Sequence, residues 1–419
     1  MIRSTVIWAT AVSLALVSAV AAYGNISRRT PNPSTASFPV ANGYSIGRAA
    51  ELKLRKNLDP VTGKIKPGPA RQIEALSREA LQLEPTNAAA LRNLAYVEAS
   101  RGRSTEATRL IRFAAQLTNR DPLTHSYLIR DYGKQNNLDG VLKQYDIAMR
   151  TQPATRDAFM GTLVQTLRYK ESVPLLDGML RAGPPWSDTF WVTALEFRPG
   201  LINLAELRGR LANIRENGQE ARDQLLLTRL AQDGAFDPAE RLVRRLDAAN
   251  GTGKRGKSRN ILRNATFAAE AKLLPFDWEL ISRGGYSGYI NKSDNTLMVE
   301  VADTLGGVAA RQLVKLTPGQ SYRLQAQASA RGAEWRAAPW IQLRCAERGD
   351  APPIKRAQTS SSKLNTVFVA AETGCSHYWL EVEGSPATYG SPHEFAIDWI
   401  TLEPARAVPT AAPGTRTSR

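Results

Sequence analysis

Cysteine and histidine are scarce in this sequence: its 419 residues include two cysteines and three histidines. A structural zinc site of the usual kind needs four Cys or His ligands at close spacing. The chain does not offer such a cluster, so we predict no metal and no cofactor. Two cysteines also exclude a small domain that is held together by several disulfides.

The sequence gives little evidence of a catalytic centre. It has no His-Glu-x-x-His pair. The spacing Gly-x-Ser-x-Gly occurs at residues 43–47 and the spacing Gly-x-x-x-x-Gly-Lys at residues 251–257, but neither follows a predicted strand, as a nucleophile elbow or a phosphate-binding loop would. Glu334, Glu381, Glu383 and Asp398 could supply a carboxylate pair for glycoside hydrolysis, but nothing in the sequence sets two of them at a useful separation. We therefore predict a protein without enzymatic activity, and keep a polysaccharide hydrolase or lyase as the alternative.

Positive charge is in excess, with a formal net charge of +16, and it is unevenly distributed. Residues 260–404 contain 14 Lys and Arg against 15 Asp and Glu, so nearly all of the excess lies before residue 260. A basic region of this kind can attract nucleic acid, anionic lipid, acidic polysaccharide or an acidic protein. The choice among them depends on where the protein is located.

The N-terminus predicts export. Residues 5–23 form one continuous run without a charge, preceded by Arg3. This run suits either a membrane anchor or a long signal peptide within residues 1–24, and Ala19-Val20-Ala21 resembles a cleavage site. We expect a periplasmic protein, anchored in the inner membrane by this segment or secreted after its cleavage. No nucleic-acid partner is expected in that location.

The following region has a regular helical repeat. Ala80, Ala114, Ala148 and Ala182 recur at one constant interval, and Pro85 and Pro153 keep the same frame. A period of about 34 residues with small residues at fixed places resembles the tetratricopeptide repeat. The resemblance is supported by further small and apolar residues at matching positions: Leu91, Leu94, Ala95, Gly102, Ala107, Ile111, Leu128, Tyr132, Val141, Tyr145, Gly234, Phe236, Ala239 and Val243.

This resemblance implies a solenoid of stacked helix pairs over residues 46–249, whose groove binds a protein partner. Residues 184–219 depart from the repeat pattern, so the number of repeats stays open there. A general helical bundle is the alternative interpretation.

Beyond a Gly-rich and basic linker at residues 250–260, the periodicity changes from helical to twofold. Alternating apolar residues in 295–302, 321–330, 377–383 and 395–402, with a turn at Pro318-Gly319, predict an antiparallel β-sandwich. The segments ILRNATF, RQLVKLTPGQSYRLQAQASA and FAIDWITLEP resemble the galactose-binding-like jelly rolls found in many carbohydrate-binding modules. The resemblance covers residues 261–404.

The predicted fold is therefore multidomain α plus β, with an N-terminal membrane or signal helix, a tetratricopeptide-like α-solenoid and a C-terminal antiparallel jelly roll. The predicted segments are 1–24 for the leader, 25–45 for a spacer, 46–249 for the helical repeats, 250–260 for the linker, 261–404 for the sandwich and 405–419 for a disordered tail.

The two cysteines, Cys345 and Cys375, both lie in or beside apolar strands of the predicted sandwich. An exported protein favours a disulfide between them, which would close a loop of about 30 residues. Two unpaired buried thiols are the alternative.

Aromatic residues are the candidates for glycan contact, because sugar sites often combine an aromatic platform with polar side chains. Tyr286, Tyr289 and Trp335 are predicted to have a surface role. Trp340 and Trp379 are further candidates, but the strand register that decides their facing is not known from the sequence. The jelly-roll resemblance implies core positions for Trp278 and Trp399.

Together these features predict a non-catalytic adaptor of the bacterial cell envelope. Its solenoid would dock a protein partner and its sandwich would bind a glycan or another protein, as in exopolysaccharide assembly or export. A structural scaffold whose sandwich has no ligand is a further alternative to the enzyme.

Overall fold

A computed structural model describes residues 43–59, 62–251, 259–302, 306–331, 335–349, 351–359, 362–386 and 392–405. Its contacts divide the chain into two compact units. The first extends to Thr166 and includes Pro174–Phe190, and the second contains Leu167–Val173 and the chain from Trp191 onward. The predicted leader at residues 5–23, the spacer up to residue 42 and the tail from residue 406 lie outside the described residues.

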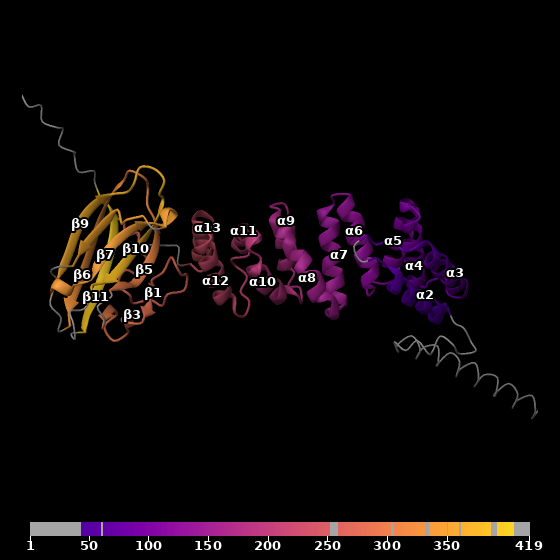
Figure 1. The fold of residues 1–419 in the computed structure, drawn as a ribbon, viewed down its shortest axis with the longest axis horizontal. Helices are drawn as coiled ribbons and strands as arrows, with labels where there is room; N and C mark the ends of the chain where they lie inside the picture. Colours follow the sequence, from indigo (N-terminus) through magenta and orange to yellow (C-terminus); the bar gives the residue numbers. More distant parts are fainter. Residues whose placement is uncertain are drawn as a thin grey trace, which may run out of the picture. The chain divides into compact units, whose positions relative to one another are not determined.

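The N-terminal part of the described chain is helical (Figure 1). Its α-helices are α2 (Gly43–Asn57), α3 (Pro67–Leu83), α4 (Ala88–Ser100), α5 (Ser104–Leu117), α6 (Pro122–Lys134), α7 (Leu138–Thr151), α8 (Arg156–Gln165), α9 (Ser172–Arg181), α10 (Ser187–Glu196), α11 (Leu201–Arg210), α12 (Gln219–Gln232) and α13 (Phe236–Ala249). In the first unit, α2 packs with α3, α4 with α5, and α6 with α7.

Polar caps define where these helices begin. Asn87 accepts a hydrogen bond from the backbone N–H of Ala90 and caps α4, while Asp121 caps α6 just before a proline at its first position. Helix α6 begins one full period of the sequence repeat after α4, and α7 begins one full period after α5. The sequence period is therefore a period of helix pairs over this stretch.

Three of the four alanines that mark the period are completely buried: Ala80, Ala114 and Ala148. Ala182 is different, because α9 ends at Arg181 and Ala182 is exposed in the following turn. Gly183 there has a φ of +59°, and Pro184 and Pro185 follow it, so the helix cannot continue. The expectation that Ala182 is a packing position was wrong.

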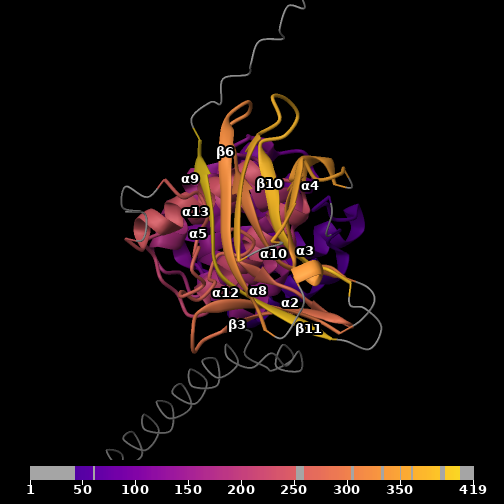
Figure 2. The same cartoon turned by 90° about the vertical axis from the view of Figure 1, so that its left-hand side faces the viewer.

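The C-terminal part of the second unit consists of two antiparallel sheets, as predicted from the twofold alternation (Figures 1 and 2). The five-stranded sheet has the order β1 (Glu279–Leu280), β5 (Gly307–Lys315), β10 (His377–Gly384), β7 (Trp340–Cys345) and β8 (Lys355–Gln358). The six-stranded sheet has the order β2 (Ser282–Arg283), β3 (Tyr286–Asn291), β4 (Thr296–Val301), β11 (His393–Pro404), β6 (Ser321–Ala330) and β9 (Lys363–Val369).

One hydrophobic core lies between the two sheets. It takes Val299 and Leu324 from the six-stranded sheet, and Ile341 and Leu380 from the five-stranded sheet. At one edge β3 crosses directly over β5: a Cβ atom at Gly288 would lie 2.0 Å from the carbonyl oxygen of Ala309. Only glycine permits this approach, which closes the sandwich at that edge.

Trp278 is buried in this core, as expected, but Trp399 is half-buried and outside it. The reason is a register shift in β11 between Ile397 and Trp399. After this shift Ile400 and Leu402 occupy the core face, so the core position that the jelly-roll resemblance implied for Trp399 was wrong.

No helix within the described residues is long and apolar enough to cross a membrane.

Candidate functional site

The outward face of the five-stranded sheet brings together two of the aromatic candidates. Core side chains on β10 are Tyr378, Leu380 and Val382, so Trp379 points to the opposite face. On β7 the same alternation places Ile341 in the core and Trp340 on the outward face. Because β10 and β7 are neighbours in the sheet, Trp340 and Trp379 share one surface.

Residues that pair directly across antiparallel strands lie on the same face. Glu381 of β10 pairs with Arg311 of β5 on one side and with Gln342 of β7 on the other. Gln342 in turn pairs with Arg356 of β8, and Trp379 pairs with Arg344 of β7. We call this surface the tryptophan face and define it by these residues: Glu279, Arg311, Trp340, Gln342, Arg344, Arg356, Trp379, Glu381 and Glu383.

Each tryptophan of this face carries an arginine over its ring. The guanidinium carbon of Arg311 lies 4.4 Å from the ring centroid of Trp379, and that of Arg356 lies 4.4 Å from the ring centroid of Trp340. Arg311 also donates to Glu279 at 2.7 Å, and Arg356 donates to Glu383 at 3.1 Å. These contacts fix the orientation of both rings and of both guanidinium groups.

The centre of the tryptophan face is polar and buried. Glu381 is 6% exposed and accepts hydrogen bonds from Gln342 Nε2 at 2.9 Å and from Arg344 Nε at 3.3 Å. A buried carboxylate needs such partners, because an unpaired one would cost several kcal/mol. The face therefore presents two aromatic rings on either side of an ordered set of hydrogen-bonding groups, with three arginines balanced by three glutamates.

The other aromatic candidates lie elsewhere. Tyr286 and Tyr289 are on β3 of the six-stranded sheet, and Trp335 is in a short 3-10 helix with its ring 5.8 Å from that of Phe395. Tyr289 is 41% exposed, and its hydroxyl donates to Glu394 at 2.5 Å, a bond that raises the pKa of Tyr289 to about 12. The structure thus brings together Trp340 and Trp379 and separates them from the other three.

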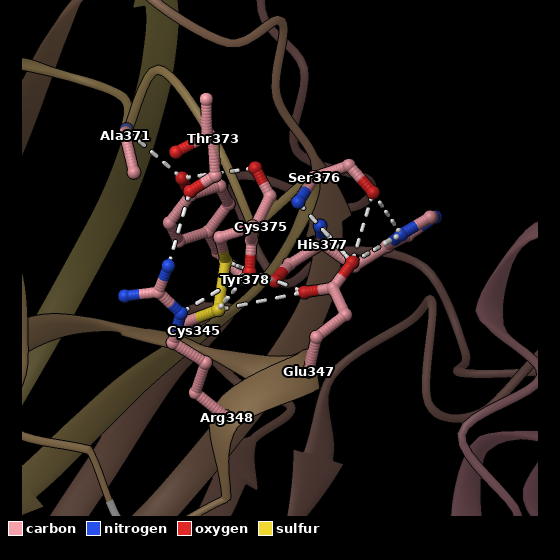
Figure 3. Close-up of a disulfide and its surroundings, with 10 residues drawn as sticks. Cys345, Glu347, Arg348, Ala371, Thr373, Cys375, Ser376, His377 and Tyr378 are labelled. Atoms are coloured by element: carbon pink, nitrogen blue, oxygen red, sulfur yellow. Dashed lines mark hydrogen bonds and ion pairs between the residues drawn. A yellow bond between two sulfur atoms is a disulfide. The ribbon is translucent and has the colours of Figure 1, made fainter.

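Cys345 and Cys375 are joined by a disulfide, with their Cα atoms 5.8 Å apart (Figure 3). The bond links the end of β7 to the residues just before β10, the two strands that carry the tryptophans. Beside it, Glu347 accepts hydrogen bonds from the backbone N–H groups of Ser376 and His377 at 3.1 and 2.9 Å. The disulfide and this carboxylate hold the two strands in register at one end of the site.

A separate hollow of about 810 Å³ lies in the first unit, on α5 and the end of α6. It is lined by Leu110 and Phe113 together with Arg109 and Arg112, and the ring of Phe113 is 47% exposed. This combination can hold an apolar anchor beside negative charge.

The sequence did not identify the polar part of the tryptophan face. Arg311, Gln342, Arg344 and Arg356 come from three strands, and only their cross-strand pairing brings them together. The available signal was alternation within one strand, which places Trp379 and Glu381 on the same face of β10. Which residues of the neighbouring strands share that face depends on the strand register, which cannot be read from one strand alone.

No protein-family model and no curated protein matches this chain. A solved structure described as "CBM4 structure and function" is similar over 34% of this chain and 99% of its own length, at 12% identity and a TM-score of 0.27. A structure of accessory secretory proteins 1, 2 and 3 from Streptococcus pneumoniae is similar over 29% of this chain and 87% of its own, at 9% identity and a TM-score of 0.23. With TM-scores this low, neither likeness supports a conclusion about the ligand of this chain.

Proposed function

We propose that this protein is a non-catalytic adaptor of the bacterial cell envelope, whose tryptophan face binds a glycan and whose helical region docks a protein. Assembly or export of an exopolysaccharide is the process that this combination suits. The observation that carries the proposal is the juxtaposition of Trp340 and Trp379 around the Glu381 hydrogen-bond network on one face of the sheet.

The chemistry of this face fits a sugar chain. Aromatic rings pack against the C–H faces of pyranose rings, and charged side chains with fixed geometry bond to hydroxyls. A guanidinium has five N–H donors, and Arg311 and Arg356 use only some of them to bond Glu279 and Glu383. The remaining donors can reach sugar hydroxyls or a uronate carboxylate beside each ring. An extended chain is the expected ligand, because the face is open.

We favour a binding role over a catalytic role at this site. Glu381 and Glu383 lie on the same face of β10, but Glu381 is buried against Arg344 and Gln342, and Glu383 is bonded to Arg356. Both carboxylates are thus occupied by arginine, whereas the general acid of a glycosidase must be free to reach the glycosidic oxygen. This arrangement favours a binding role over the hydrolase or lyase alternative.

We propose that the helical region binds a protein at the hollow on α5 and α6. This hollow lies within the solenoid that the tetratricopeptide resemblance implies. An acidic segment with one large apolar side chain is the occupant that fits Phe113 between Arg109 and Arg112. Phe113→Ala should remove the capture of such a partner. Leu83→Ala, an exposed leucine on α3, is the matched control.

Affinity electrophoresis of the full chain through gels that contain single polysaccharides tests the glycan proposal. We expect retardation by at least one acidic or neutral exopolysaccharide, at least a tenfold weaker effect for Trp379→Ala and Trp340→Ala, and no change for Tyr286→Ala. Each variant must keep the circular dichroism spectrum of the wild type, so that a loss of binding is not caused by unfolding. A panel that retards no form of the protein would favour the scaffold alternative.

A further inference from the structure

A second cluster of potential ligands lies within the second unit, where the first turn of α13 meets the ends of β5 and β10. Asp237 and Glu240 are three residues apart on α13, so both carboxylates project from one side of the helix. His377 of β10 and Lys315 of β5 are cross-strand partners and face the same carboxylates. Oxygen and nitrogen atoms of Asp237, Glu240 and His377 all lie within 4.8 Å of one another.

The histidine is held with one nitrogen directed at the carboxylates. His377 is 1% exposed, and its ring stacks on that of Phe236 with centroids 5.4 Å apart. On its other side, Nδ1 lies 3.2 Å from Glu347 Oε1 (Figure 3). Nδ1 also lies 3.0 Å from Ser376 Oγ, so this side of the ring is occupied and Nε2 is the nitrogen that faces the carboxylates of α13.

The Nε2 atom lacks a hydrogen-bond partner among the described residues. Nε2 is buried and lies 3.9 Å from both Asp237 Oδ1 and Glu240 Oε2, beyond hydrogen-bonding distance. A buried nitrogen without a partner is unfavourable and calls for an explanation. Since the neighbouring carboxylates are acceptors, only a donor or a cation between them can satisfy all three atoms.

Lys315 shows that the space between the carboxylates attracts a cation. Its ammonium group lies 2.6 Å from Asp237 Oδ1 and 3.1 Å from Glu240 Oε2. The hydrogen bond from Lys315 holds the pKa of Asp237 below its ordinary value, so this carboxylate is ionised at neutral pH. The lysine side chain is 39% exposed and has a flexible stem, so it can leave toward solvent.

We propose that Asp237, Glu240 and His377 bind a zinc ion, and that Lys315 is the cation that zinc displaces. One imidazole and two carboxylates are a ligand set that zinc accepts, and a tetrahedral zinc places its ligand atoms about 3.3 Å apart. The carboxylates would approach Nε2 by about 0.6 Å from the present 3.9 Å. Zinc would take the place of the Lys315 ammonium between the carboxylates, while Arg244 stays bonded to the other oxygen of Glu240.

Glu347 is the positioning residue of this site. Its contact with Nδ1 fixes the orientation of His377, the role that second carboxylates have beside zinc-bound histidines. The metal would connect α13 to β10 of the five-stranded sheet. The site lies on the same face of β5 and β10 as the tryptophan face but shares none of its residues, so the zinc proposal and the glycan proposal can fail separately.

The test is a titration of the chelator-treated full chain with Zn²⁺ by calorimetry, and with Co²⁺ by visible absorption. We expect one equivalent to bind, with at least tenfold weaker binding for Asp237→Asn, for Glu240→Gln and for Glu347→Gln. Lys315→Met should bind about tenfold more tightly, because the competing cation is gone. Asp247→Asn, which alters the ion pair of α13 with Arg263, is the matched control and should bind like the wild type.

The Lys315→Met variant separates the proposal from a purely structural role of the cluster. If the lysine only neutralises the carboxylates, its removal lowers stability and creates no metal affinity. The proposal is overturned if neither the wild type nor Lys315→Met gives a cobalt spectrum, or if Asp237→Asn leaves the zinc affinity unchanged. Circular dichroism of each variant establishes that it is folded.

Discussion

Removal of the disulfide should destabilise the sandwich by a calculable amount. The bond closes a loop with a sequence separation of 30 residues, and the chain-entropy relation gives about 3.6 kcal/mol for a loop of this length at room temperature. Most of this loss should come from the unfolded state, because Glu347 still ties Ser376 and His377 to the end of β7. For a domain of this size the loss corresponds to a melting temperature lower by roughly 10 °C.

The assay is urea unfolding, followed by tryptophan fluorescence, of the wild type and of the Cys345→Ala/Cys375→Ala variant. Reduced wild type serves as a second comparison, since it lacks the bond but keeps both sulfur atoms. Both forms should unfold at lower urea with a similar loss of free energy. A loss below about 1 kcal/mol in both would refute the reasoning, because it would mean that the loop gains little freedom when the bond is absent.

Two further predictions concern charged side chains that the fold holds by ion pairs or hydrogen bonds. Arg92→Met should lower the free energy of unfolding in urea by about 3–5 kcal/mol, because Arg92 is 1% exposed and pairs with Asp121 at 2.7 Å and Glu51 at 3.4 Å. The control Arg78→Met, at an exposed arginine, should change this free energy by less than about 1 kcal/mol. Equal effects of the two substitutions would contradict the prediction. Burial raises the pKa of Glu347, but hydrogen bonds from Ser376 and from backbone N–H groups outweigh it and leave this pKa below 4.5. The stability that Glu347 contributes is therefore full above pH 4.5 and is lost as the pH falls through the lower folded pKa, so the stability difference between wild type and Glu347→Gln should shrink in unfolding experiments between about pH 6 and pH 3.

Local patterns in the sequence were sufficient for the helix pairs α4–α5 and α6–α7 and for the strands β4, β6, β10 and β11. The repeat period predicted the positions of Ala114 and Ala148, because a buried alanine allows close helix crossing at the same place in each pair. The pattern failed at Ala182, where a local stop signal ended α9 before the expected contact. A period describes helices only as long as nothing within it terminates one of them.

The site depends on contacts between strands that are distant in sequence. Alternation could show that Trp379 and Glu381 share a face, but not that Trp340 and Arg311 lie on the same surface, since this requires the pairing of β10 with β7 and β5. The register shift in β11 illustrates the same limit, because one extra residue moved Trp399 away from the core. His377 and Asp237 are likewise distant in the sequence, and only the packing of α13 brings them together.

Oxidative footprinting of the full chain tests the central claim most directly. Tryptophan and tyrosine side chains are oxidised with and without a saturating polysaccharide, and the modification of each residue is quantified by mass spectrometry. The account predicts that the ligand protects Trp340 and Trp379, while Tyr289 and Trp335 react as before. Protection of Tyr289 and Trp335 with Trp340 and Trp379 unchanged would contradict it.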